Sequence, residues 1–190
     1  MQVPTDHHMI AAKRILRYLK KIEFYGIHQT KSTEFTLCGY TDSDFTRSSE
    51  DAKNTSSYLF TLGNGPFSWN SHKQSIVAQS LAESEYVAAA EAAYQALWLR
   101  KLLMDIKFEQ KFPTDLFIDN KSAISIVKNP VWHGKTKHIN VKYHAVRDIV
   151  EKNEINVQYC PSELQLADIF TKPFQKKLGQ SPSRISHYYP

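Results

Sequence analysis

At 190 residues, the chain is long enough for one domain with a real core and a short extension at either end. Its 42% of hydrophobic residues is typical of a globular protein, and no apolar run approaches the length that spans a bilayer. The net charge of +5 and the isoelectric point near 9.1 suit a polyanionic partner without requiring one.

The N-terminal region is predicted to hold a basic amphipathic helix followed by a linker. Asp6, His7 and His8 stand where a signal peptide needs its apolar segment, so we expect an intracellular chain without a secretion signal. Across residues 9–22, apolar side chains recur at helical spacing on one face, and lysines and arginines cover the rest. The basic face either contacts phosphates or is solvated while the apolar side packs on a neighbour.

Three strands with short connections are predicted between residues 35 and 71. The first, at 35–45, is apolar-rich and ends in carboxylates, with Asp42 on the same face as Cys38 and Tyr40 because strand residues alternate. Alternation over 57–62, the turn sequence at 63–65 and a strand at 66–71 complete an antiparallel hairpin sheet. Asp42 is either a turn residue or a carboxylate placed to bind a cation.

Residues 81–106 are predicted to form the long helix of the domain. One stripe of this helix recurs at gaps of three and four residues: Ala89, Ala92, Ala96, Leu99, Leu103 and Ile106. Extended backwards, the stripe reaches Glu85, whereas Glu83 falls in another row and suits the positive end of the helix dipole. We therefore expect Glu85 to point at the sheet, where a carboxylate without a partner would be costly.

The remaining elements alternate strands and helices. Residues 115–119 form a short strand, and Asn120 caps a helix that continues to residue 127. Asp119 thus lies where a strand meets a helix, a common place for chemistry in α/β folds, although a turn-forming pair explains it equally well locally. A basic stretch, a helix that ends at 150 and a strand at 155–160 follow.

The last predicted element is a short helix with an acid inside it. Ser162 and Gln165 are predicted to form a capping box for this helix, on which Asp168 lies among apolar residues. Four carboxylates at element ends or inner faces form a hard oxygen set that suits a pair of magnesium ions: Asp42, Glu85, Asp119 and Asp168. Two such ions can activate water for phosphodiester cleavage. The histidines at 133, 138 and 144 match no zinc pattern.

Short motifs extend these observations into a family resemblance. They are GYTDSDF at 39–45, FSWNS at 67–71 with KQ at 73–74, SLAESEY at 80–86, WLR at 98–100, DNKSA at 119–123, KHI at 137–139 and QLADIFTKP at 165–173. Through them the chain resembles the ribonuclease H domain at the end of the Pol polyprotein of copia-type LTR retrotransposons. The helical sequence AAKRILRYLK at 11–20 resembles the segment that joins the reverse transcriptase to that domain.

The resemblance implies an α/β fold of the ribonuclease H type, with a mixed five-stranded sheet flanked by helices, in which three strands are antiparallel and two parallel. It divides the chain into a polymerase-derived helix and linker (1–32), a ribonuclease H domain (33–174) and a loose tail (175–190). It also implies hydrolysis of the RNA strand of RNA/DNA hybrids by two Mg²⁺ ions, which Mn²⁺ can replace, held by Asp42, Glu85, Asp119 and Asp168. The expected setting is the cytoplasm, in a particle of the element, or the nucleus, beside the parent reverse transcriptase and with no membrane partner.

Further residues are candidates for holding the hybrid or releasing the product. Those expected to contact 2′-hydroxyls or phosphates are Ser43, Lys73, Asn120, Lys121, Ser122, Lys135, Lys137 and His138. His138 and His144 are candidates for product release, because the place of the usual histidine loop reads Cys160-Pro161-Ser162. The alternative is a remnant that binds hybrids but cuts them weakly. A recombinase-type nuclease is disfavoured because Glu85 precedes Asp119.

Overall fold

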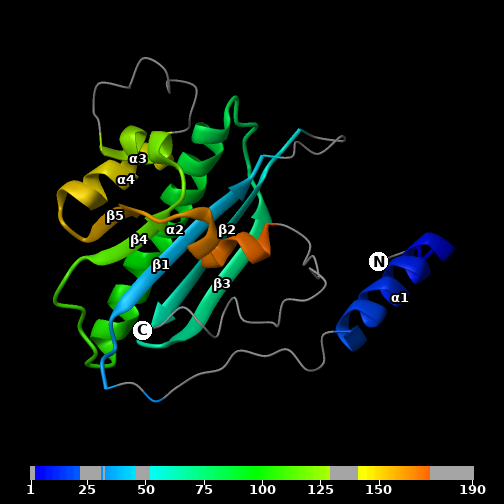
Figure 1. The fold of residues 1–190 in the computed structure, drawn as a ribbon, viewed down its shortest axis with the longest axis horizontal. Coiled ribbons are helices and arrows are strands. Elements are labelled where there is room, and N and C mark those ends of the chain that lie inside the picture. The colour runs from blue at the N-terminus through cyan, green and yellow to red at the C-terminus, as the bar shows by residue number, and fades with distance from the viewer. Residues whose placement is uncertain (1–2, 22–30, 32, 46–51, 129–140, 172–190) are drawn as a thin grey trace.

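A five-stranded mixed sheet lies at the centre of the computed structural model, which describes residues 3–21, 31, 33–45, 52–128 and 141–171, without the side chains of Lys21 and residues 141–145. The strands are β1 (Leu37–Asp44), β2 (Thr55–Leu62), β3 (Gly65–Lys73), β4 (Thr114–Ile118) and β5 (Ile155–Tyr159), in the order β3-β2-β1-β4-β5 (Figure 1). β1, β2 and β3 pair antiparallel, whereas β4 and β5 run parallel to β1. The predicted fold class is confirmed.

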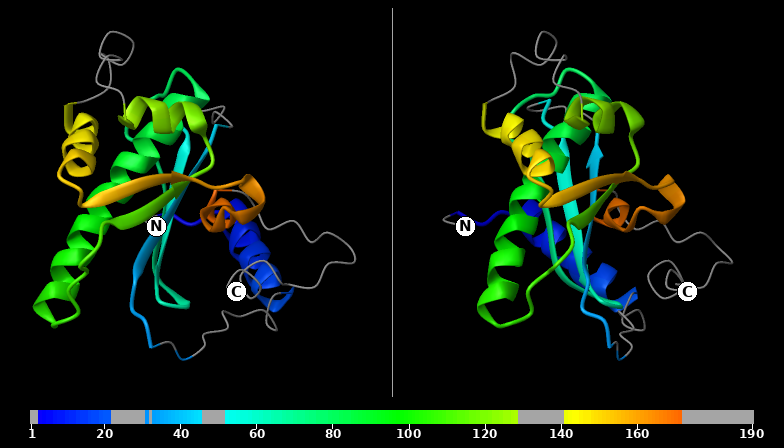
Figure 2. Two further views of the ribbon diagram at one scale, coloured as in Figure 1. Left: turned by 60° about the vertical axis from the view of Figure 1, so that its left-hand side comes forward. Right: turned by 90° about the vertical axis from the view of Figure 1, so that its left-hand side faces the viewer.

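Helices cover one face of the sheet and a short segment covers part of the other. α2 (Leu81–Asp105) packs on β1, β2 and β4, and α3 (Lys121–Lys128) and α4 (Val141–Glu151) pack against α2. Two short 3₁₀ helices, η2 (Ser162–Leu164) and η3 (Leu166–Phe170), follow β5, and η3 contacts β1 and β2. Figure 2 shows α2 and η3 on opposite sides of the strands. The predicted order of elements is therefore confirmed.

The N-terminal helix, α1 (Asp6–Lys21), is present as predicted. Its described side chains are all exposed, including apolar Ile15, Leu16 and Leu19, so its apolar stripe is not buried against any described residue. Among the described helices, none combines the length and apolar content needed to cross a membrane.

The inner face of α2 is built largely from alanine, which allows the helix backbone to approach the sheet closely. Ala89, Ala92 and Ala96 are fully buried, and Leu99 and Leu103 continue the predicted stripe. The prediction is wrong for Ile106, which is 55% exposed because α2 ends at Asp105 and the residue caps its C-terminus.

Gly39 in β1 lies where two large core side chains meet. A Cβ atom at this position would stand 2.6 Å from Cε1 of Phe60 and 2.9 Å from Cδ1 of Leu116, both of them fully buried. We therefore expect Gly39→Ala to lower the free energy of unfolding by about 1–3 kcal/mol through overpacking, measured by urea denaturation. Cys38→Ala, a small change on the other face of the same strand, is the control. A loss no greater than that of the control would contradict the close packing.

Candidate metal centre

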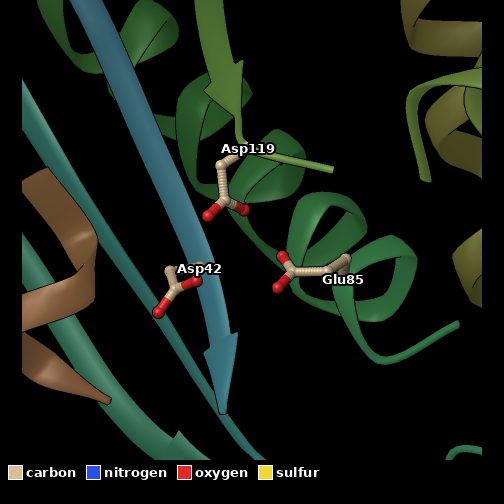
Figure 3. A group of neighbouring side chains, drawn as sticks. All are labelled: Asp42, Glu85 and Asp119. Atoms are coloured by element: carbon tan, nitrogen blue, oxygen red, sulfur yellow. The ribbon is translucent and has the colours of Figure 1, made fainter. Parts of the chain in front are cut away.

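Three acids from distant parts of the chain converge at one edge of the sheet. Asp42 lies near the end of β1, Asp119 directly follows β4, and Glu85 lies near the start of α2. Each offers one carboxylate oxygen, and these oxygens lie within 4.8 Å of one another. Figure 3 shows the three side chains pointing toward a common space. They meet because β1 and β4 are parallel neighbours, so both strands end at the same edge.

The site is largely buried and strongly negative. Asp42 and Glu85 are each 3% exposed, and Asp119 is half-buried. Burial, and then the negative charges of the three acids, raise the pKa of the neighbouring Cys160 thiol to about 12. Like charges gathered in a poorly solvated place favour a bound cation.

The donor set fits magnesium in chemistry and in spacing. Carboxylate oxygens are the ligands that Mg²⁺ prefers, and two ligands of one ion at about 2.1 Å are at most ~4.2 Å apart. A small rotation of side chains would bring the three oxygens, now within 4.8 Å, to that spacing. Asp42, Glu85 and Asp119 could therefore hold a divalent ion.

Glu85 and Glu83 divide their roles as the helical periodicity predicts. The carboxylate of Glu85 accepts a hydrogen bond from the backbone N–H of Ser43 at 3.3 Å, which fixes it toward β1. Glu83 instead helps to cap the start of α2: its N–H donates to Oγ of the N-cap residue Ser80 at 3.2 Å, and its Oε2 accepts from the N–H of Gln79, the residue before the cap, at 2.9 Å.

Asp42 and Asp119 each accept a hydrogen bond from a hydroxyl late in the chain. Oγ1 of Thr171 donates to Oδ2 of Asp42 at 2.6 Å, and Oγ of Ser162 donates to Oδ2 of Asp119 at 2.9 Å. Neither contact is predicted from the sequence. The only sequence signal for Thr171 is its place in the motif that contains Asp168.

The fourth predicted acid, Asp168, is half-buried on η3 and does not belong to the group of three close oxygens. Its segment is nevertheless tied to the site, because Thr171, three residues later, contacts Asp42. The structure thus brings together three of the four predicted acids, and a metal-binding role for Asp168 stays a prediction.

The predicted capping box of Ser162 and Gln165 is wrong. Residue Pro161 is the N-cap of η2 and makes no side-chain cap hydrogen bond, and Ser162 donates to Asp119 instead. Gln165 caps η3, accepting from the N–H of Ala167, while its amide nitrogen reaches into the sheet. Ser162 donates to the carboxylate of Asp119, and Gln165 donates to carbonyls of β1 and β4, so the two side chains do not form the predicted capping box with each other.

The candidate substrate contacts lie at several places. Asn120 caps α3 as predicted, accepting from the N–H of Ser122 at 2.9 Å and of Ala123 at 3.1 Å. Nζ of Lys121 lies 4.8 Å from the centre of the Tyr159 ring. Ser122 is exposed.

Two other candidates, Lys73 and Ser43, contrast in exposure. Lys73 is exposed at the end of β3. Ser43 is only 5% exposed, and its hydroxyl hydrogen-bonds that of Ser84, so it supports Glu85 from within the core. Lys135, Lys137 and His138 lie outside the described residues, as does the side chain of His144.

Comparison with known proteins places this site in context. No family model matches the chain. The "Retrovirus-related Pol polyprotein from transposon RE2" of Arabidopsis thaliana is 35% identical over 184 residues, which cover 97% of this chain and 13% of that protein. The corresponding polyprotein from transposon TNT 1-94 of Nicotiana tabacum is 35% identical over 177 residues, or 90% of this chain and 13% of that protein.

Solved structures give weaker likenesses. The N-terminal RNase H domain of rv2228c from Mycobacterium tuberculosis, solved as a fusion with maltose-binding protein, has a TM-score of 0.49 and 11% identity, covering 73% of this chain and 91% of that chain. The relationship to known proteins rests on the two polyproteins. The chain spans only 13% of the length of each of them. On that basis, the chain is homologous to a part of copia-type retrotransposon Pol polyproteins.

Proposed function

We propose that the chain is a ribonuclease H that hydrolyses the RNA strand of RNA/DNA hybrids, leaving a 3′-hydroxyl and a 5′-phosphate. The observation that supports this best is the convergence of Asp42, Glu85 and Asp119 at the edge of the sheet. Relatedness to Pol polyproteins supports a role in copying the element's RNA, next to the reverse transcriptase. The domain limits 33–174, with residues 1–32 from the polymerase region, belong to this proposal, as does an intracellular site of action.

The proposed centre holds two Mg²⁺ ions, which Mn²⁺ can replace, on Asp42, Glu85, Asp119 and Asp168. Bound there, such ions would activate the attacking water and stabilise the departing oxygen. The chain's own residues hold this arrangement in place: the buried Asp42 and Glu85 form its inner wall, and half-buried Asp119 borders the side open to solvent.

The substrate is proposed to lie across the start of α3, next to Asp119. Asn120, Lys121 and Ser122 follow Asp119 directly, and Ser122 and Lys121 are exposed. Small polar groups of this kind read 2′-hydroxyls in the minor groove, which distinguishes RNA from DNA. Lys73 and the lysines at 135 and 137 are proposed phosphate contacts, consistent with the net charge of +5.

The proposal is tested by incubating the chain with an RNA/DNA hybrid labelled at either end of the RNA strand. With Mg²⁺ we expect internal cleavage of the RNA strand only, with products that carry a 5′-phosphate. RNA/RNA and DNA/DNA duplexes of the same sequence should stay intact, and EDTA should abolish cleavage. If the chain binds Mg²⁺ and the hybrid but leaves the RNA whole, the hybrid-binding remnant is the correct reading.

A further inference from the structure

The segment of residues 162–171, here named the docked segment, supplies hydrogen-bond donors to two of the three clustered acids. Thr171 donates to Asp42 and Ser162 donates to Asp119. The two ends of the segment therefore contact two different acids, one in β1 and one directly after β4.

The docked segment is held to four of the five strands by hydrogen bonds. Nε2 of Gln165 donates to the carbonyl of Thr41 in β1 at 2.9 Å and to that of Phe117 in β4 at 3.3 Å. From β2, Oγ of Ser57 donates to the carbonyl of Ala167 at 2.9 Å. From β3, Oγ of Ser71 donates to the carbonyl of Phe170 at 2.7 Å. The segment that carries the two donors is thus fixed both to β1, which contains Asp42, and to β4, which Asp119 directly follows.

The hydroxyl of Thr171 has one proton and two acceptors in reach. Oδ2 of Asp42 lies 2.6 Å away, and the carbonyl oxygen of Asp168 lies 3.1 Å away. An ionised carboxylate is the stronger acceptor and forms the shorter bond, so the proton points to Asp42. Asp42 is 3% exposed, so water is a poor substitute for this donor.

We propose that Thr171 is a positioning residue that orients the carboxylate of Asp42 for a divalent ion, and that Ser162 does the same for Asp119. With Oδ2 fixed by the hydroxyl, the carboxylate cannot rotate freely, and its other oxygen is held toward the space shared with Glu85 and Asp119. The inference rests on the proposed function for its effect on cleavage, but its effect on ion binding requires no cleavage.

The test is Thr171→Val, which keeps the shape of the side chain and removes the hydroxyl. Calorimetric titration of the metal-free protein with Mn²⁺ should show about tenfold weaker binding, the usual cost of losing a partner that orients a metal ligand. Thr171→Ser should restore most of the affinity. In the hybrid assay, the metal concentration for half-maximal cleavage should rise by the same factor, with KM for the hybrid unchanged.

The matched control is Ser71→Ala, which removes the hydroxyl that donates to the carbonyl of Phe170 and touches no acid. Its Mn²⁺ affinity should stay within twofold of wild type. If Thr171→Val binds Mn²⁺ like wild type, or if Ser71→Ala loses as much affinity, the positioning role is overturned. Should Thr171→Val fail to fold, Ser162→Ala at an exposed hydroxyl replaces it, with several-fold weaker binding expected and unchanged binding counting against the proposal.

The two proposals can fail separately. A wild-type chain that binds Mn²⁺ but cuts no hybrid would refute the ribonuclease activity. The tenfold difference between wild type and Thr171→Val in Mn²⁺ binding would still test the positioning role in that case.

Discussion

Asp42→Asn is expected to reduce cleavage of the RNA strand by at least about 1000-fold, which corresponds to ~4 kcal/mol of lost transition-state stabilisation. The substitution removes one negative charge from a buried group of three close acids, so the proposed ions would lose a ligand. Single-turnover cleavage of the labelled hybrid at saturating Mg²⁺ measures the effect. The matched control is Asp105→Asn at the far end of α2, which removes the same charge from an exposed position about 30 Å along the helix from Glu85.

Thermal unfolding provides a second measurement for the same variant. Without metal, Asp42→Asn should melt at or above the wild-type temperature, because one of three crowded carboxylates has become neutral. Adding Mg²⁺ should raise the melting temperature of wild type and change that of the variant little. Asp42 is not a metal ligand if the variant cleaves the hybrid within tenfold of the wild-type rate. The same conclusion holds if Mg²⁺ raises the melting temperature of the variant as much as that of wild type.

Glu85→Gln is expected to lower the cleavage rate on the order of 100–1000-fold, whereas Glu83→Gln should leave it within threefold. Glu85 belongs to the acidic group, while Glu83 helps to cap α2 through Ser80 and Gln79. The amide oxygen of a glutamine can accept the same hydrogen bond from Gln79, so Glu83→Gln should lower the free energy of unfolding by less than about 1 kcal/mol, mainly through the helix dipole. Cleavage assays and urea denaturation of both variants give the comparison.

The comparison of these two variants is informative because Glu85 and Glu83 are close neighbours on one helix and both are buried, at 3% and 5% exposure respectively. Burial alone therefore cannot tell them apart. Equal losses of activity would mean that the whole first turn of α2, and not the carboxylate of Glu85, matters for catalysis.

Periodicity accounts for the parts that could be predicted from the sequence. The alternation of apolar and polar residues predicts the strands of the sheet. The alanine stripe of α2 predicts the side on which Glu85 lies, since a helix turns 100° per residue and places residues 83 and 85 on different faces. The strand-to-helix junction after β4 likewise places Asp119, because neighbouring parallel strands end at one edge.

Contacts between distant residues account for the parts that could not. Local spacing favours a capping box for Ser162 and Gln165, but Gln165 is 4% exposed and satisfies carbonyls of β1 and β4 instead. Nothing near Thr171 in the sequence indicates a contact with Asp42, 129 positions earlier. Ser43 is a predicted contact to the hybrid, yet its backbone N–H and its hydroxyl face inward, to Glu85 and Ser84.

The separation of Asp42 and Thr171 also sets when the centre can be completed during synthesis. A ribosome that adds about 5–20 residues per second needs roughly 6 to 26 s to pass from one to the other, a span of 129 residues. In that interval the hairpin of β1, β2 and β3 can pair, since its contacts are local. The proposed ion site therefore cannot be complete in the nascent chain until all five strands and the docked segment have been translated.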